Sequence, residues 1–361
     1  MRPCARRCTG LSPHSDSALQ ARTGLTIGRM LSFLLGAAAT LAEAFAAAAP
    51  RPAVRFDWST VPVFFHADNF TGDWNNESLL QLAKYPIVTI EKWMGSLAAC
   101  KADGWSPCCG AGGGADEVGE TAVCEEDRII SNFARLKAIN KNVSTVLYLN
   151  SVLNFPQYRL AQQMQSHPEY WLRDASGKVI GMYGDAGPPN MTVFDFSQPA
   201  VREIFVGACV DAIKTGHVDG CFIDRAVDGF PTNLDPAKQA AYDAGHLQVL
   251  HEMQRQISEI SGGPLIANHA YNLSGINSVQ IENFGRDVQT GWQGWNTSMA
   301  QLKESVASGK LVEAHIPCAK GTMDGCTGDI TDTLAAFLVV AGHQSYCKRC
   351  VLDCVGLRVS F

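Results

Sequence analysis

The chain has 361 residues, of which 46% are hydrophobic and 18% are charged, and its formal net charge is −6. A chain of this length is long enough for one large domain with a substantial core. It contains no long basic run, so the composition gives no reason to expect nucleic acid as a partner.

The first fifty residues differ in composition from the rest of the chain. Met30–Ala49 has an apolar core that follows Arg29 and ends in small residues, which is typical of a secretory signal. Residues 1–29 would be an unusually long region before such a signal, so a start at Met30, a membrane anchor and an organelle transit sequence are alternatives. We predict that residues 1–50 form an N-terminal extension with a signal peptide or anchor, and that the protein is secreted or lumenal.

Glycosylation sequons and cysteines fit the same route. Thirteen cysteines are many for a reducing compartment, and a Gly-rich insertion, Cys100–Cys124, is crowded with them, so we expect disulfides there. Six N-x-Ser/Thr sequons begin at Asn69, Asn76, Asn142, Asn190, Asn272 and Asn296.

A zinc site at the C-terminus is the alternative use of the cysteines. Ligand-like spacings occur at His343, Cys347, Cys350 and Cys354. His66 and His315 invite a metal as well, but neither belongs to an H-x-H or H-E-x-x-H pattern. We therefore expect no metal and no other cofactor.

After residue 50, a pattern of apolar strand, polar loop and amphipathic helix recurs. Little chain remains after the last predicted strand, so we expect an eighth helix to be missing or replaced. The pattern predicts an α/β fold, a (β/α)8 TIM barrel over residues 51–347 that is incomplete at its eighth unit, followed by a Cys-rich tail at 348–361. The predicted strands are Val61–Asp68, Tyr85–Trp93, Ser144–Leu153, Val218–Asp224, Leu265–Tyr271, Ser278–Phe284, Leu311–Pro317 and Gln344–Cys347. The predicted helices are Glu77–Lys84, Glu125–Asn140, Pro199–Thr215, Pro236–Ile260, Ser298–Ser308 and Ile330–Ala341.

Two of these strands end on a carboxylate. The segment VDGCFIDRAVDGF runs from an apolar strand into Asp224, and SVQIENF ends on Glu282 after a spacing of about two βα units. Barrel enzymes place catalytic residues at such strand ends. Cleaving an acetal needs a proton for the leaving oxygen and a negative group at the oxocarbenium-like centre, which two carboxylates supply. The alternative is a structural ion pair of either acid with Arg225 or Arg286.

Other polar and aromatic side chains fall at or beyond the predicted strand ends. Carboxylates, amides and imidazoles can hold sugar hydroxyls, and aromatic faces can pack on a sugar ring. An ion pair with Lys92 would explain Glu91 equally well, and core packing would explain any of the aromatic residues. The candidate substrate-binding residues are Asp68, Glu91, Trp93, Tyr148, Asn150, Asn268, His269, Trp292, Trp295 and His315.

Four segments carry a family resemblance, and their order is more specific than any one of them. They are HPEYWLRDASGKVI, DFSQPAVREIF, DGCFIDRAVDGF and QIENFG. Together they resemble hypothetical glycosyl hydrolase families with a TIM-barrel fold, over about Val61–Cys347. The resemblance implies a catalytic Asp at the end of the fourth strand, Asp224 as nucleophile or base, with Glu282 as general acid. The reverse assignment stays open, and the resemblance implies no particular sugar.

The sequence thus predicts a glycosidase that acts on a polysaccharide or oligosaccharide. The alternatives are an inactive secreted carbohydrate-binding barrel and an enzyme of another class on the same fold, such as a metal-dependent hydrolase or an aldolase. An aldolase needs a lysine on a strand, and the predicted strands offer Lys92. Carboxyl groups about 5 Å apart would predict retention of anomeric configuration, and a separation of roughly 6.5–9.5 Å would predict inversion.

Overall fold

The computed structural model describes residues 54, 56, 58–69, 72–94, 124–181, 191–226, 234–285, 293–316 and 331–349. The chain divides into two compact units, Met1–Ala49 and Pro50–Phe361, and the described residues belong to the second. The predicted signal or anchor, most of the Cys/Gly-rich insertion and nearly all of the tail lie outside the described residues. Within them, no helix has both the length and the apolar character needed to cross a bilayer.

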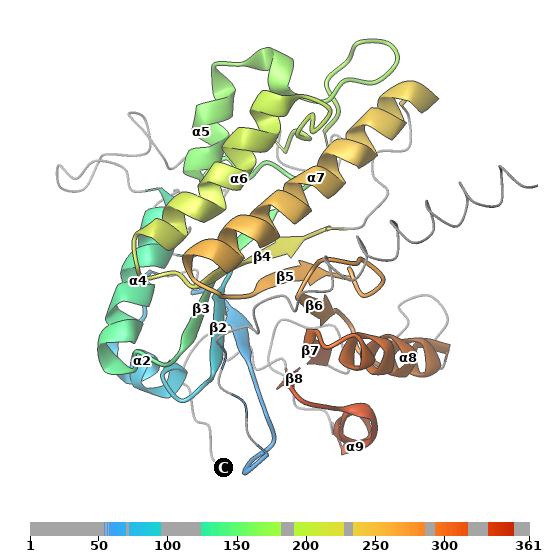
Figure 1. Ribbon diagram of the computed structural model, residues 1–361. Coiled ribbons are helices and arrows are strands. Elements are labelled where there is room, and N and C mark those ends of the chain that lie inside the picture. The colour runs from blue at the N-terminus through green and yellow to red at the C-terminus, as the bar shows by residue number, and fades with distance from the viewer. Residues whose placement is uncertain are drawn as a thin grey trace, which may run out of the picture. The chain divides into compact units, whose positions relative to one another are not determined.

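Eight parallel strands form the centre of the fold, and each pairs with its neighbour in chain order (Figure 1). They are β1 (Phe65–Ala67), β2 (Ile87–Ile90), β3 (Ser144–Asn150), β4 (Gly220–Asp224), β5 (Leu265–Asn268), β6 (Ser278–Ile281), β7 (Leu311–Ile316) and β8 (Ser345–Arg349).

The seam between β8 and β1 nearly closes this sheet into a barrel. Val63 and Cys347 form a single parallel bridge there. The N–H of Phe64 donates to the carbonyl of Cys347 at 3.2 Å, and the N–H of Cys347 donates to the carbonyl of Pro62 at 3.0 Å. The structure confirms the predicted barrel of eight parallel strands, whereas the prediction for an eighth helix falls outside the described residues.

Helices follow most of the strands. They are α2 (Asn76–Leu82), α4 (Glu125–Ile139), α5 (Arg159–Gln165), α6 (Pro199–Lys214), α7 (Pro236–Ile260), α8 (Gln293–Ala307) and α9 (Thr331–Val340). The longest, α7, begins where Asp235 accepts hydrogen bonds from the N–H groups of Ala237 and Lys238, with Pro236 at its first position. A side-chain acceptor before the first turn and a proline inside it both favour a helix start. Helices α6 and α7 pack side by side (Figure 1).

The connection between β5 and β6 has no helix, since residues 269–277 form turns and irregular coil. The Lys310 ammonium holds this loop by donating to the carbonyls of Ala270, Tyr271 and Leu273 at 3.1, 2.8 and 2.7 Å. Between Asp224, at the end of β4, and Glu282, just after β6, the described part of the chain therefore forms one helix, α7. Two complete βα units would contain two helices.

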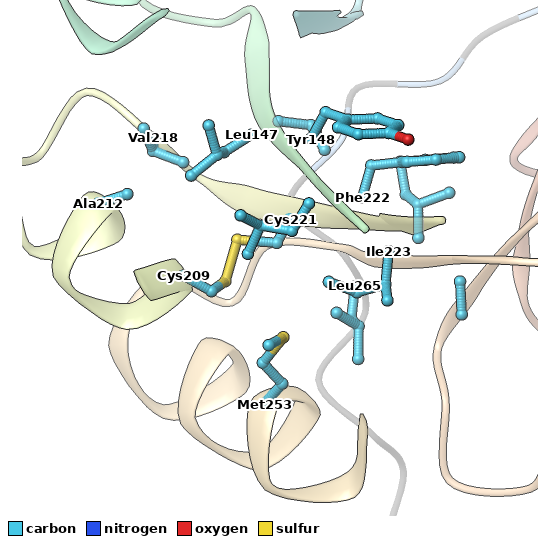
Figure 2. Packing of buried hydrophobic residues seen from close by; sticks show 14 of the residues in the cluster. Leu147, Tyr148, Cys209, Ala212, Val218, Cys221, Phe222, Ile223, Met253 and Leu265 are labelled. Atoms are coloured by element: carbon cyan, nitrogen blue, oxygen red, sulfur yellow. A yellow bond between two sulfur atoms is a disulfide. The ribbon is translucent and has the colours of Figure 1, made fainter. Parts of the chain in front are cut away.

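The packing around β4 has two faces, as Figure 2 shows. On the outer face, Cys221 forms a disulfide with Cys209 of α6, and both residues are fully buried. On the inner face, the rings of Phe222 and Tyr148 stack with centroids 5.6 Å apart. Successive residues of a strand point to opposite faces, so β4 contributes Cys221 to the contact with the helices and Phe222 to the barrel interior.

Candidate active site

A cavity of about 90 Å³ opens at the carboxyl ends of the strands, where barrel enzymes hold their substrates. Every one of the eight strands, or the residue or two after it, contributes to its wall. The lining residues are His66, Glu91, Lys92, Tyr148, Phe222, Asp224, Asn268, Gln280, Glu282, His315 and Lys348.

Three neighbouring strands supply the central polar groups. Asp224 is the last residue of β4, Asn268 is the last of β5, and Glu282 directly follows β6. The next residue in each case has a positive φ: 56° at Arg225, 61° at His269 and 58° at Asn283. Non-glycine residues rarely adopt this left-handed conformation, and such residues cluster at functional sites. Each turn redirects the chain immediately after the side chain that faces the cavity.

The Asp224 carboxylate accepts four hydrogen bonds. Oδ2 accepts from the Tyr148 hydroxyl at 2.6 Å and from the Asn150 amide at 3.0 Å. Oδ1 accepts from the Arg225 backbone N–H at 2.9 Å and from the Asn268 amide at 3.0 Å. Amide and backbone N–H groups can only donate, so this environment fits the ionised carboxylate.

The Asn268 amide joins the two acids. Its Nδ2 lies 3.0 Å from Oδ1 of Asp224 and 2.9 Å from Oε2 of Glu282, so these two oxygens are at most about 5.9 Å apart. Both acids therefore contact the same amide nitrogen, each through one of its carboxylate oxygens.

Glu282 is held in its ionised form. His269 Nε2 lies 3.6 Å from Glu282 Oε2. The interaction with His269, then the Asn268 amide and the nearby His315, lowers the pKa of Glu282 to about 2, against the opposing effect of its burial. Burial lowers the pKa of His315 to about 4, so this histidine is neutral at physiological pH.

The opposite wall of the cavity carries an ion pair. The Lys92 ammonium lies 2.7 Å from Glu91 and 4.4 Å from the centroid of the Tyr148 ring, and Glu91 also lies 3.3 Å from His66 Nε2. Burial alone would raise the pKa of Glu91, but Lys92 and His66 outweigh it and lower the pKa below its usual range. The predicted alternative for Glu91, an ion pair with Lys92, is therefore present, and the pair faces the cavity.

A polar layer lies below the cavity. Gln280 Nε2 approaches His66 Nδ1 at 3.1 Å and donates to Glu313 Oε2 at 3.2 Å. Glu313 is fully buried, and burial raises its pKa to about 8. Burial lowers the pKa of His66 to about 3, so its imidazole is neutral.

The predicted substrate-binding residues separate into two groups. Glu91, Tyr148, Asn268 and His315 line the cavity, as do both predicted catalytic acids. Asn150 is buried behind Asp224 and also accepts from the backbone N–H groups of Val152 and Leu153.

The other described candidates, Asp68, Trp93, His269 and Trp295, are not among the residues that line the cavity. Asp68 accepts from the backbone of Trp93, and burial together with Glu91 raises the pKa of Asp68 to about 7. Trp93 packs edge-on against Phe155, and Trp295 packs edge-on against Phe284. Their roles as substrate-binding residues stay predictions, as does that of His269 beside Glu282. Trp292 lies outside the described residues.

Sequence reasoning did not select five residues of the cavity wall as site residues: His66, Lys92, Phe222, Gln280 and Lys348. Three of them could have been found from strand periodicity. His66, Phe222 and Gln280 each stand two positions before a selected acid, and side chains two positions apart on a strand share a face. Lys348 donates to the carbonyl of His66 across the seam, a contact that requires the barrel to close.

The described residues contain no cluster of three or more His, Cys, Asp or Glu side chains suited to a metal ion. Of the possible zinc ligands at the C-terminus, Cys347 is a buried free thiol and His343 packs against the ring of Phe56. Cys350 and Cys354 lie outside the described residues.

The fold and the cavity define a (β/α) barrel with an enzyme-like site at the carboxyl ends of its strands. Residues 137–354 match the model of Hypothetical glycosyl hydrolase family 15, and the chain belongs to this family. The protein is therefore classed with the glycoside hydrolases, as the sequence predicts.

Solved structures of low sequence identity are similar to this chain. The glycoside hydrolase domain of PelA from Pseudomonas aeruginosa is 16% identical, with a TM-score of 0.47 over 82% of this chain and 96% of that one. Ega3 from Aspergillus fumigatus, solved with galactosamine, is 11% identical, with a TM-score of 0.45 over 81% and 94%. A cycloalternan-degrading enzyme from Trueperella pyogenes is 13% identical, with a TM-score of 0.49 over 88% of this chain and 45% of that one. No curated protein sequence matches the chain.

Proposed function

We propose that the protein hydrolyses O-glycosidic bonds of a polysaccharide or oligosaccharide, with Asp224 as nucleophile and Glu282 as acid and base. One observation carries the proposal: a single amide nitrogen, Asn268 Nδ2, hydrogen-bonds both carboxylates in an open cavity. If either acid served only in a structural ion pair or a helix cap, it would need its own partner, and the two acids would have no reason to share one hydrogen-bond donor.

The family resemblance favours Asp224 as the nucleophile, whereas the low pKa of Glu282 in the free protein means that this acid must gain its proton when the substrate binds. All four contacts of Asp224 come from donors, which suits a carboxylate that must stay ionised to attack. Glu282 accepts a hydrogen bond from the Asn268 amide through Oε2, and His269 Nε2 lies 3.6 Å from the same oxygen. A bound sugar excludes water, and desolvation raises the pKa of a carboxyl group. Glu282 would thus take up its proton as the substrate binds.

The two carboxylates lie close enough to share one amide nitrogen, and retaining glycosidases hold their carboxyl groups about 5–5.5 Å apart, so we propose a double displacement. A carboxylate oxygen of Asp224 attacks the anomeric carbon as the bond to the leaving oxygen breaks, and Glu282 gives that oxygen its proton. Glu282 then removes a proton from water, whose oxygen attacks the same carbon and releases Asp224. Two inversions at one carbon retain its configuration.

We expect Asp224→Asn to reduce turnover of aryl glycosides by about a thousandfold or more, because the amide cannot form the glycosyl ester. Glu282→Gln should reduce turnover by about 10²–10⁴-fold for poor leaving groups and by much less for nitrophenol, which needs no proton. Initial rates on a panel of nitrophenyl glycosides measure both effects. Proton NMR of the first-formed sugar should show the anomer of the substrate.

Glu252→Gln is a matched control, since Glu252 lies on the outside of the barrel on α7 and pairs with Arg255. This variant should keep the wild-type rate. Full activity of Asp224→Asn would refute the assignment of the nucleophile, and the opposite anomer would refute the double displacement. If the folded wild-type protein binds saccharides but turns none over, the carbohydrate-binding barrel replaces the proposal.

A further inference from the structure

Asn268 occupies an unusual place between the two acids. It ends β5, which lies between β4 and β6 in the sheet, and it is only 3% exposed. Both N–H groups of its amide are used, one on Asp224 and one on Glu282. Its carbonyl oxygen Oδ1 is buried and has no hydrogen-bond partner among the described residues. Among the described residues, the amide therefore hydrogen-bonds to the two carboxylates and to no other group.

We infer that Asn268 is a positioning residue that fixes the spacing of the two catalytic carboxylates through a two-donor amide bridge, rather than a residue that binds sugar hydroxyls. The inference rests on the proposed function, because it assumes that Asp224 and Glu282 are the reacting groups.

The bridge needs the chemistry of an amide. A primary amide has two N–H donors on one nitrogen, which can face two acceptors at once. A serine hydroxyl has one proton and could donate to one acid only. An aspartate of the same shape would place a third carboxylate where the structure has a donor. Turning the amide over would bring Oδ1 against both acids, so the carboxylates also determine its orientation.

The bridge acts on two acids whose other neighbours differ. Tyr148 donates to Asp224, and Lys92 interacts with this carboxylate electrostatically. Glu282 instead faces His269 and His315. Tyr148 hydrogen-bonds to Asp224, whereas Asn268 hydrogen-bonds to both acids. Loss of the bridge should therefore change the titration of both acids, whereas loss of one of the other donors should change only one.

The test compares Asn268→Asp with Tyr148→Phe, which removes a donor from Asp224 alone. The readout is the pH profile of kcat on an aryl glycoside with a poor leaving group, because Glu282 takes up its proton in the complex; the acidic limb then reports the nucleophile and the basic limb reports the acid. Asn268→Asp should move both limbs to higher pH and lower kcat by about a hundredfold, with KM changed less than threefold. Tyr148→Phe should move the acidic limb alone.

Asn268→Ser gives a second, independent variant that keeps one donor. It should move one limb only and lose less kcat than Asn268→Asp, with thermal melting used to confirm that each variant is folded. A rise in KM at unchanged kcat and unchanged limbs would overturn the inference, because that is the effect of losing a sugar contact. Asp224→Asn, measured in parallel, tests the proposed function separately: if it keeps full activity, the roles of the acids are wrong, whatever Asn268 does.

Discussion

Glu313 shows how far burial in the barrel interior can shift the pKa of a single residue. Its side chain is fully buried on β7, where Gln280 donates to Oε2 and Oε1 has no hydrogen-bond partner among the described residues. Burial raises the pKa of this carboxyl to about 8 from an ordinary value of 4.5, with Gln280 and Lys348 opposing that change. The folded protein therefore keeps a proton on Glu313 that the unfolded chain releases.

This proton makes the stability depend on pH. Between pH 4.5 and 8 the folded state binds more protons at Glu313 than the unfolded state, so the free energy of unfolding falls as the pH rises. Glu313→Gln keeps the neutral shape and should be more stable than wild type at pH 8 by on the order of 1–3 kcal/mol, with little difference at pH 4.5. Urea unfolding at the two pH values measures this. Equal pH dependence in both proteins would show that Glu313 is ionised in the fold.

Of the four acids selected from the sequence, Glu91, Asp224 and Glu282 line the cavity and Asp68 does not, and the sequence did not show what surrounds them. A polar residue at the end of an apolar strand was enough to select Asp224, Asn268 and Glu282. That Tyr148 and Asn150 hold Asp224 depends on the register of β3 against β4, which pairs Asn150 with Asp224. Register arises from contacts between distant segments, so the local pattern could not give it.

Among the elements, the disulfide joins a helix to the strand that carries Asp224. Cys209 of α6 and Cys221 of β4 are 12 residues apart in sequence, so the bond closes a short loop. Closing a loop of this size stabilises a fold by roughly 2–4 kcal/mol through the unfolded chain. The bond is three residues before Asp224, so it also anchors the strand beneath the cavity.

Replacing both cysteines by alanine should therefore lower the free energy of unfolding by about 2–4 kcal/mol and weaken the effect of a reductant on the melting temperature. The matched control is Cys347→Ala, which removes a buried thiol that forms no disulfide. This control should lose less stability and keep its sensitivity to the reductant. If the control and the double variant lose the same amount, packing rather than the covalent bond would account for the loss.

Element boundaries were predicted best where a local signal marks them. The predicted helix Pro236–Ile260 matches α7, whose start is marked by Asp235 and Pro236. The first strand was predicted as Val61–Asp68, but β1 covers Phe65–Ala67 only. The strand is short because residues before it meet β8 at a single bridge, and this pairing depends on closure of the barrel.

For the whole molecule, the sequons can be set against the surface. Asn76, Asn142, Asn272 and Asn296 are exposed, whereas Asn69 is half-buried. Asn190 lies outside the described residues. Attached glycans need open surface, and the four exposed positions provide it.

We expect the full chain, expressed in a eukaryotic secretory host, to carry N-linked glycans at the four exposed asparagines. Treatment with an N-glycosidase should increase its electrophoretic mobility, and successive Asn→Gln changes at these four positions should reduce the shift in steps. The Asn69→Gln variant should change the shift least. Secreted protein without any shift would contradict glycosylation, and protein that stays in the cytosol would contradict the predicted route.

The missing helix between β5 and β6 limits how this barrel can vary in evolution. Asn268 and Glu282 are 14 positions apart, on two adjacent strands joined by a loop that Lys310 holds. An insertion between β4 and β5 can be absorbed at the ends of α7, but an insertion between β5 and β6 would disturb the bridging amide and its acid together. Diversification toward new sugars is therefore expected in the other strand-to-helix loops, while the β5–β6 segment is inherited as one unit.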